Sequence, residues 1–94
     1  MQVDLNTFNK LIQKPIIYIL LRSTSSTKHV SLWDIIKSQS DTLIINVEEN
    51  KDLMTYLNVR ILPLLLVYVD GQLDKTFTVK NISELIEYVK SRTI

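Results

Sequence analysis

The chain has no cysteine and no alanine among its 94 residues, and it contains only one glycine, two prolines and one histidine. The absence of cysteine excludes disulfides, thiolate catalysis and cysteine-ligated metals on this chain. The single histidine, His29, has no cluster of acidic residues around it at ligand spacing, so we predict no metal site and no cofactor. The scarcity of glycine and proline argues against a disordered chain or a linker.

The charges of the chain almost cancel, with 11 basic and 10 acidic residues and a net charge of +1. A nucleic-acid binder normally carries a basic surplus, because its affinity comes from neutralising phosphates. The apolar runs, such as residues 16–21, are far shorter than the ~20 residues that span a bilayer. The first residues lack the layout of a signal peptide. We therefore expect no nucleic-acid partner, no membrane and a cytoplasmic location.

Hydrophobic residues make up 46% of the chain, and nearly all of them are Ile, Leu and Val. A chain of this length fits one domain, residues 1–94, with a core large enough to fold without a disulfide or a metal. Alternating helical and β-branched apolar patterns predict an α/β fold. The expected order is helix 4–13, strand 16–21, a helix that ends at 38–41, strand 42–47, a short helix after residue 50, a strand that ends at 69, strand 73–79 and a final helix from residue 81.

Several polar residues predict where these elements begin and turn. Asp4 and Asn50 are expected to cap the helices that follow them. Asn81 and Glu84 have the spacing of a capping box at the start of the last helix. The pair Asp70-Gly71 between two apolar runs predicts a two-residue type I′ hairpin.

The second helix is expected to bury a stripe of apolar side chains. Val30, Trp33 and Ile36 recur at helical spacing, and Leu32 and Ile35 widen the same face. The apolar strand 16–21 has no polar face, which predicts burial on both sides in the middle of a sheet.

Two motifs resemble the thioredoxin family, and the resemblance extends over essentially the whole chain. Residues 46–50, N-V-E-E-N, are similar to the N-V-D-E-N stretch of that family. Residues 57–63, L-N-V-R-I-L-P, are similar to its Y-x-V-R-G-I-P segment. The resemblance implies a three-layer α/β/α sandwich with a central mixed sheet of about four strands, and a cis proline at Pro63.

The departures from the family lie in its chemistry. The W-C-G-P-C-K motif corresponds to residues 23–28, S-T-S-S-T-K, so both cysteines are replaced by threonine. The buried acid of the family falls at Tyr18, which we expect to be a core side chain, as we expect of Trp33. Dithiol exchange needs a thiolate that attacks and a second sulfur that resolves the mixed disulfide. We therefore predict a redox-inactive domain that is not a dithiol–disulfide enzyme.

The former active-site loop leaves two interpretations open. Thr24, Ser25, Ser26 and Thr27 could simply cap the helix that follows, because Ser and Thr hydroxyls satisfy orphan amide groups. Alternatively, the same helix start, with Lys28, Arg22 and His29 nearby, could hold a small anion or a thiol compound such as glutathione.

The resemblance implies a second half of the site at Leu62 and Pro63. In redox-active members, the backbone before the cis proline pairs with an extended substrate peptide by β-augmentation. Loss of the cysteines does not remove that groove, so the sequence predicts a non-catalytic protein- or peptide-binding module. An accessory or assembly subunit, related to the proteins of cell redox homeostasis, remains a further alternative.

Overall fold

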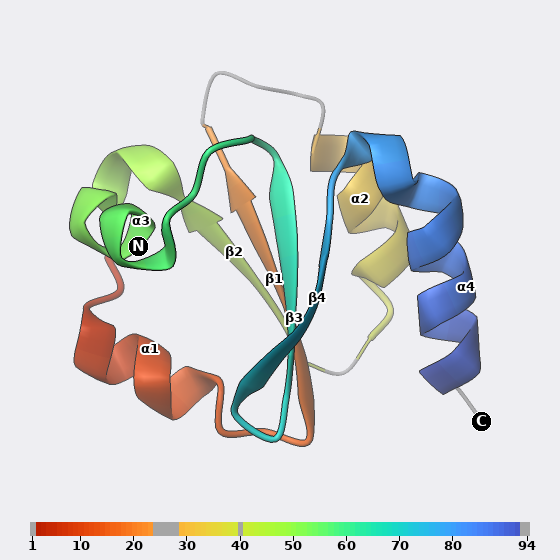
Figure 1. Ribbon diagram of the computed structural model, residues 1–94, viewed down its shortest axis with the longest axis horizontal. Helices are drawn as coiled ribbons and strands as arrows, with labels where there is room; N and C mark the ends of the chain where they lie inside the picture. Colours follow the sequence, from red (N-terminus) through yellow and green to blue (C-terminus); the bar gives the residue numbers. More distant parts are fainter. Residues whose placement is uncertain (1, 24–28, 40, 93–94) are drawn as a thin grey trace.

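The computed structural model describes residues 2–23, 29–39 and 41–92. Four helices, four strands and two short 3₁₀ helices follow one another in these ranges (Figure 1). In chain order they are α1 (Leu5–Leu11), β1 (Ile16–Arg22), α2 (His29–Ile36), β2 (Thr42–Asn46), η1 (Val47–Glu49), α3 (Lys51–Leu57), β3 (Leu64–Val69), β4 (Gln72–Phe77), η2 (Val79–Asn81) and α4 (Ile82–Arg92).

The four strands form one mixed sheet in the order β2-β1-β3-β4. β1 runs parallel to β2 and antiparallel to β3, and β3 pairs antiparallel with β4. The register pairs Leu21 of β1 with Leu64 of β3. The five central residues of β1 are buried, as its uniformly apolar sequence predicts.

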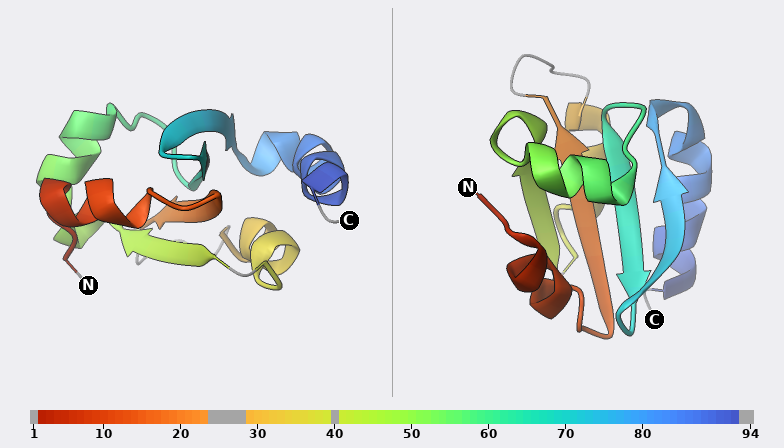
Figure 2. Two further views of the ribbon diagram at one scale, coloured as in Figure 1. Left: turned by 90° about the horizontal axis from the view of Figure 1, so that it is seen from below. Right: turned by 60° about the vertical axis from the view of Figure 1, so that its left-hand side comes forward.

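Helices cover both faces of the sheet, so the domain has the expected three layers. α1 and α3 lie on one face, and α2 and α4 lie on the other (Figure 2). Each face has its own apolar cluster. The first cluster includes Phe8, Ile12, Ile19, Leu21, Leu53 and Tyr68, and the second includes Tyr18, Leu20, Leu32, Ile36, Leu65, Phe77 and Leu85.

The buried stripe of α2 differs in part from the expected one. Leu32 and Ile36, four positions apart, are fully buried, whereas Trp33 and Ile35 are only partly buried at the edge of the second cluster. Leu32 is therefore central to the stripe rather than an extension of it. The side chain of Val30 lies outside the described residues.

The hairpin between β3 and β4 has the predicted geometry. Asp70 and Gly71 both have positive φ, at 52° and 83°, as the two central residues of a type I′ turn require. β4 ends at Phe77, two residues before the expected boundary, because Thr78 and the residues after it turn into η2.

Helix capping follows the prediction at α1 but not at α4. Asp4 Oδ1 accepts a hydrogen bond from the Thr7 N–H at 2.7 Å, as expected. The predicted capping box of Asn81 and Glu84 is wrong in register. Thr78 is the capping residue, its Oγ1 accepting from Lys80 N–H at 3.2 Å, and its own N–H donates to Asn81 Oδ1 at 3.3 Å.

The residue before α3 also departs from its predicted role. Asn50 occupies the position that precedes the helix, but its side chain makes no capping hydrogen bond to α3. It instead accepts from the Val3 N–H and donates to the Asn46 carbonyl.

Within the described ranges, no helix is long and apolar enough to cross a membrane.

Candidate functional site

The predicted site lies where β1 ends and β3 begins. Because Leu21 pairs with Leu64, Ser23 and Pro63 each lie within two residues of the same pair and at the same end of the sheet (Figure 1). The Ser23 hydroxyl donates to Glu48 Oε2 at 2.5 Å, which ties the end of β1 to η1. The end of β1 and the start of β3 therefore lie at the same end of the sheet.

The segment before β3 presents apolar side chains to solvent next to a buried proline. The Leu62–Pro63 peptide bond is cis, and the Pro63 ring is fully buried. Ile61 is 60% exposed and Leu62 is 39% exposed. Within the described part of the chain, the backbone N–H and C=O groups of Ile61 and Leu62 make no hydrogen bond. The backbone of this segment can therefore hydrogen-bond to a neighbouring extended strand without breaking a hydrogen bond that it already makes.

The other predicted half of the site is not described. Thr24, Ser25, Ser26, Thr27 and Lys28 lie outside the described residues, and so does the side chain of His29. Arg22, which we expected to reinforce an anion site, is half-buried. Its Nε donates to Asn46 Oδ1 at 2.9 Å, across the parallel β1–β2 pair.

Tyr18, which the resemblance places at the buried acid of thioredoxins, is a core side chain, as predicted. Only 1% of it is exposed, and its ring meets that of Tyr88 edge-on at 6.4 Å between centroids. Burial raises the pKa of the Tyr18 hydroxyl. Its oxygen has no hydrogen-bond partner within the described ranges. Tyr18 therefore stays protonated near neutral pH and cannot act as a buried carboxylate would.

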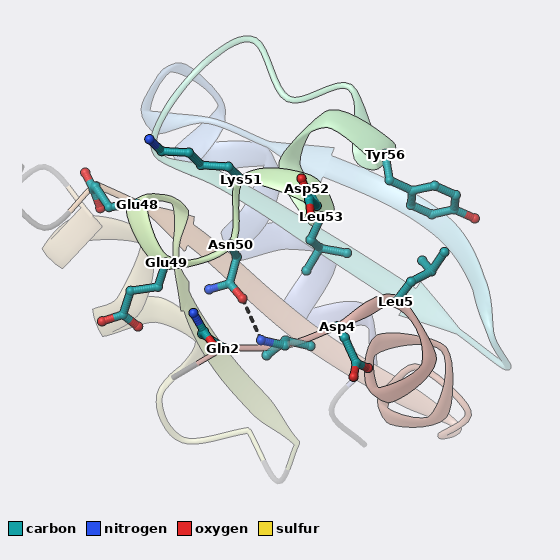
Figure 3. Close-up of a pocket in the computed structure, with 11 residues that line it drawn as sticks. Gln2, Asp4, Leu5, Glu48, Glu49, Asn50, Lys51, Asp52, Leu53 and Tyr56 are labelled. Atoms are coloured by element: carbon teal, nitrogen blue, oxygen red, sulfur yellow. Dashed lines mark hydrogen bonds between the residues drawn. The ribbon is translucent and has the colours of Figure 1, made fainter.

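Sequence reasoning missed a cleft of about 560 Å³ between the N-terminal segment and α3. Its walls come from two distant parts of the chain, residues 2–5 and 48–56. Its lining residues are Gln2, Val3, Asp4, Leu5, Glu48, Glu49, Asn50, Lys51, Asp52, Leu53 and Tyr56 (Figure 3). In the described ranges, no group of three or more His, Asp or Glu residues could hold a metal ion.

No protein-family model matches the sequence, and no curated protein is significantly similar to it. Solved structures with the same fold are numerous. A mutant thioredoxin from Halobacterium salinarum matches with a TM-score of 0.79 and 17% identity, over 100% of this chain and 90% of that chain. Mitochondrial thioredoxin 3 from Saccharomyces cerevisiae, in its oxidised form, matches with a TM-score of 0.77 and 21% identity, over 97% and 93%.

Thioredoxin from Trypanosoma brucei brucei matches with a TM-score of 0.78 and 9% identity, over 98% of this chain and 88% of that chain. These likenesses cover nearly the whole domain at low identity, so they establish the thioredoxin-like fold. The chain has this fold without any cysteine, and so without the thiols that dithiol exchange requires.

Proposed function

We propose that the chain is a redox-inactive thioredoxin-fold module that binds an extended segment of a partner protein beside Leu62 and Pro63. The observation that carries the proposal is the exposed pair Ile61–Leu62, with no backbone hydrogen bond in the described structure, directly before the cis peptide bond. A segment of this kind offers main-chain groups for affinity and apolar side chains for selectivity, which are the two components of β-augmentation.

The physical reason to expect a partner here is the cost of exposing this surface. Removing apolar surface from water is favourable by about 25 cal/mol of free energy per Å². A partner that covers the two exposed aliphatic side chains is therefore stabilised by their burial. Ile61 and Leu62 are adjacent in sequence and therefore project in different directions from the backbone. One side chain can pack into a pocket of the partner, while the other packs against the side of the bound segment. Thr24, Ser25, Ser26 and Thr27, which lie outside the described residues, are the further residues that we propose to contact the partner.

Binding of an unknown partner can be tested with a peptide selected from a random library displayed on phage. The selected peptide is then titrated into the isotope-labelled chain, and amide shifts are followed by NMR. We expect the shifts to cluster at residues 22–29 and 60–64. Leu62→Asp should weaken binding about tenfold or more, as expected when a central apolar contact is lost.

The matched control is Leu73→Asp, an exposed leucine of β4 near the hairpin at the opposite end of the sheet. It should leave the affinity unchanged. Equal losses in the two variants, or shifts confined to the hairpin end, would contradict the proposed groove.

The sequence also left open a small anion or a thiol compound at the start of α2. Reduced glutathione and inorganic phosphate, titrated separately, probe that alternative. Shifts limited to residues 22–30 with millimolar ligand, and none at Ile61 or Leu62, would favour it over peptide binding.

The absence of redox activity is part of the same proposal, because a threonine hydroxyl neither ionises near neutral pH nor accepts electrons. In a disulfide-reduction assay the chain should show no turnover above the uncatalysed rate. Measurable turnover that follows the purified protein through chromatography would contradict this. The cytoplasm remains the compartment we expect for the module.

A further inference from the structure

The cleft between the N-terminal segment and α3 has walls that are fixed to each other. Asn50 Oδ1 accepts from the Val3 N–H at 2.5 Å, and Asn50 Nδ2 donates to the Asn46 carbonyl at 2.9 Å. Figure 3 shows the first of these bonds crossing the base of the cleft. The concavity is therefore built by a buried polar contact between two distant parts of the chain, and it does not depend on a loose terminus.

The base and one end of this cleft are apolar. Val3 and Leu53 are buried beneath it. Leu5 is 40% exposed and Tyr56 is 61% exposed, and their side chains lie at the same end of the cleft (Figure 3). An exposed tyrosine beside an aliphatic side chain is typical of the residues that dominate protein interfaces.

The rim of the cleft is acidic, although the whole chain has a charge of +1. Four lining residues are acidic and one, Lys51, is basic, which gives the lining a charge of −3. Glu48 and Glu49 lie at the end opposite to Tyr56, and Asp4 and Asp52 lie between the two ends (Figure 3). The hydrogen bonds from Thr7 lower the pKa of the Asp4 carboxyl, so this charge persists into acidic solution.

The distribution of these carboxylates indicates the kind of cation that fits. In the described part of the chain they form no group that could chelate a metal ion. They are instead spread along a groove with an apolar base. Cationic side chains spaced along an extended peptide can pair with the carboxylates of such a rim. An apolar side chain between them can pack against Leu5 and Tyr56.

We propose that this cleft docks a partner-protein segment that carries lysine or arginine side chains around an apolar one. The apolar side chain lies against Leu5 and Tyr56, and the cationic groups lie against the acidic rim, where arginine can also stack on the Tyr56 ring. The lining of the cleft does not include Ile61, Leu62 or Pro63, although Glu48 on its rim accepts a hydrogen bond from Ser23 at the end of β1. Either proposal can therefore fail without the other.

The probe is a synthetic peptide of about ten residues in which arginine and leucine alternate with serine. Two reference peptides replace either all arginines by glutamate or all leucines by serine. Each is titrated into the isotope-labelled full chain and followed by amide NMR shifts. We expect the first peptide alone to bind, with shifts at residues 2–5 and 48–56, and we expect its affinity to fall as salt screens the rim.

One variant at the acidic rim and one at the apolar end of the cleft separate the two components. Asp52→Lys and Tyr56→Ala should each weaken binding at least fivefold, because they remove a rim charge and the exposed ring. The matched controls are Glu87→Lys on α4 and Leu73→Ala on β4, both exposed and outside the cleft. The controls should bind like the unchanged chain, and thermal unfolding should show that all four variants are folded.

Three outcomes would overturn this inference. Equal weakening by Asp52→Lys and Glu87→Lys would show that only the overall charge matters. Equal binding of the peptide without leucine would show a generally cation-attracting surface and not a docking cleft. Shifts at Ile61 and Leu62 in place of the cleft would support the groove proposal and exclude this one.

Discussion

The Asn50 side chain joins two parts of the chain that lie 47 positions apart. Its Oδ1 accepts a hydrogen bond from the Val3 N–H at 2.5 Å in a buried setting, and its Nδ2 donates to the Asn46 carbonyl. A buried backbone N–H needs a partner, because it has lost its hydrogen bond to water. Asn50 supplies that partner to the N-terminal segment, which does not belong to the sheet.

Replacing this side chain should therefore destabilise the whole domain. Asn50→Ala leaves the buried Val3 N–H without an acceptor, which costs about 2 kcal/mol of unfolding free energy. Urea denaturation measures the loss. Asn9→Ala on the exposed face of α1 is the matched control and should change stability by no more than about 0.5 kcal/mol. A loss equally small for Asn50→Ala would show that the N-terminal segment adds little to the fold.

The hairpin turn provides a second test. Gly71 has φ of 83°, a conformation that costs a residue with a Cβ about 1–2 kcal/mol. A Cβ at this position would also lie 2.7 Å from Gln13 Oε1, but Gln13 is exposed and flexible and can rotate away. We expect Gly71→Ala to lower the unfolding free energy by about 1–2 kcal/mol in urea denaturation.

The double variant Gln13→Ala/Gly71→Ala separates the two causes. If the backbone conformation is the main cost, removing the Gln13 side chain should restore little of the lost stability. Full recovery in the double variant would assign the loss to the side-chain contact and contradict the backbone explanation.

Local chemistry was sufficient to predict most of the fold. Asp4 caps α1, Asp70-Gly71 forms the turn, and the uniformly apolar residues 16–21 form a strand buried on both faces, because each depends on neighbours within a few positions. Features that depend on distant partners were predicted less well. Asn50 has the sequence position of a helix cap, but the competing Val3 N–H lies 47 residues away and cannot be inferred from spacing.

The start of α4 shows how two neighbouring caps compete. Thr78 and Asn81 both suit a capping position, and Glu84 lies three residues after Asn81 as a capping box requires. In the structure Thr78 caps η2, which leads directly into α4, while Asn81 Nδ2 donates to Glu84 Oε2 at 3.3 Å. The pattern was correctly recognised as a helix start, and only its register was wrong.

The candidate site stays a prediction, and only the placement of its described part can be compared with the sequence. Pro63 and the end of β1 could be placed together from the resemblance, and the β1–β3 register brings them to one end of the sheet. The acidic cleft was not predicted because two distant segments, residues 2–5 and 48–56, each supply part of its apolar surface and part of its carboxylates. Each of its acids also has an ordinary local interpretation, such as the capping role of Asp4.

Tyr18 offers a test of the core through its buried hydroxyl. Its hydroxyl is buried without a hydrogen-bond partner in the described structure, and such a group costs about 1–3 kcal/mol. Tyr18→Phe removes that cost and keeps the ring against Tyr88, so we expect stability to rise by about 1 kcal/mol in urea denaturation.

Tyr88→Phe is the contrasting variant, because the Tyr88 hydroxyl donates to Asp74 Oδ2 at 2.6 Å. It should lower stability where Tyr18→Phe raises it. A loss of stability in Tyr18→Phe would mean that the Tyr18 hydroxyl has a partner after all.

Tyr88 also predicts how stability changes in alkaline solution. Burial, followed by the hydrogen bond to Asp74, raises the pKa of Tyr88 to about 12, although Arg92 acts in the opposite direction. The pKa of tyrosine in an unfolded chain is about 10. Between these values the folded state keeps a proton that the unfolded state loses, so the stability is complete below pH ~10 and falls as pH rises towards 12.

Denaturation at a series of pH values, with an ultraviolet titration of the phenolate, measures this effect. In Tyr88→Phe the unfolding free energy should decrease less steeply with rising pH, but it should still decrease, because burial also raises the pKa of Tyr18 and Tyr68. Asp74→Asn should lower the pKa of Tyr88, since the Asp74 charge and hydrogen bond both raise it. If Tyr88→Phe loses stability with pH as steeply as the unchanged chain, the Tyr88–Asp74 contact contributes nothing to the alkaline limit, and the decline must come from the other buried tyrosines.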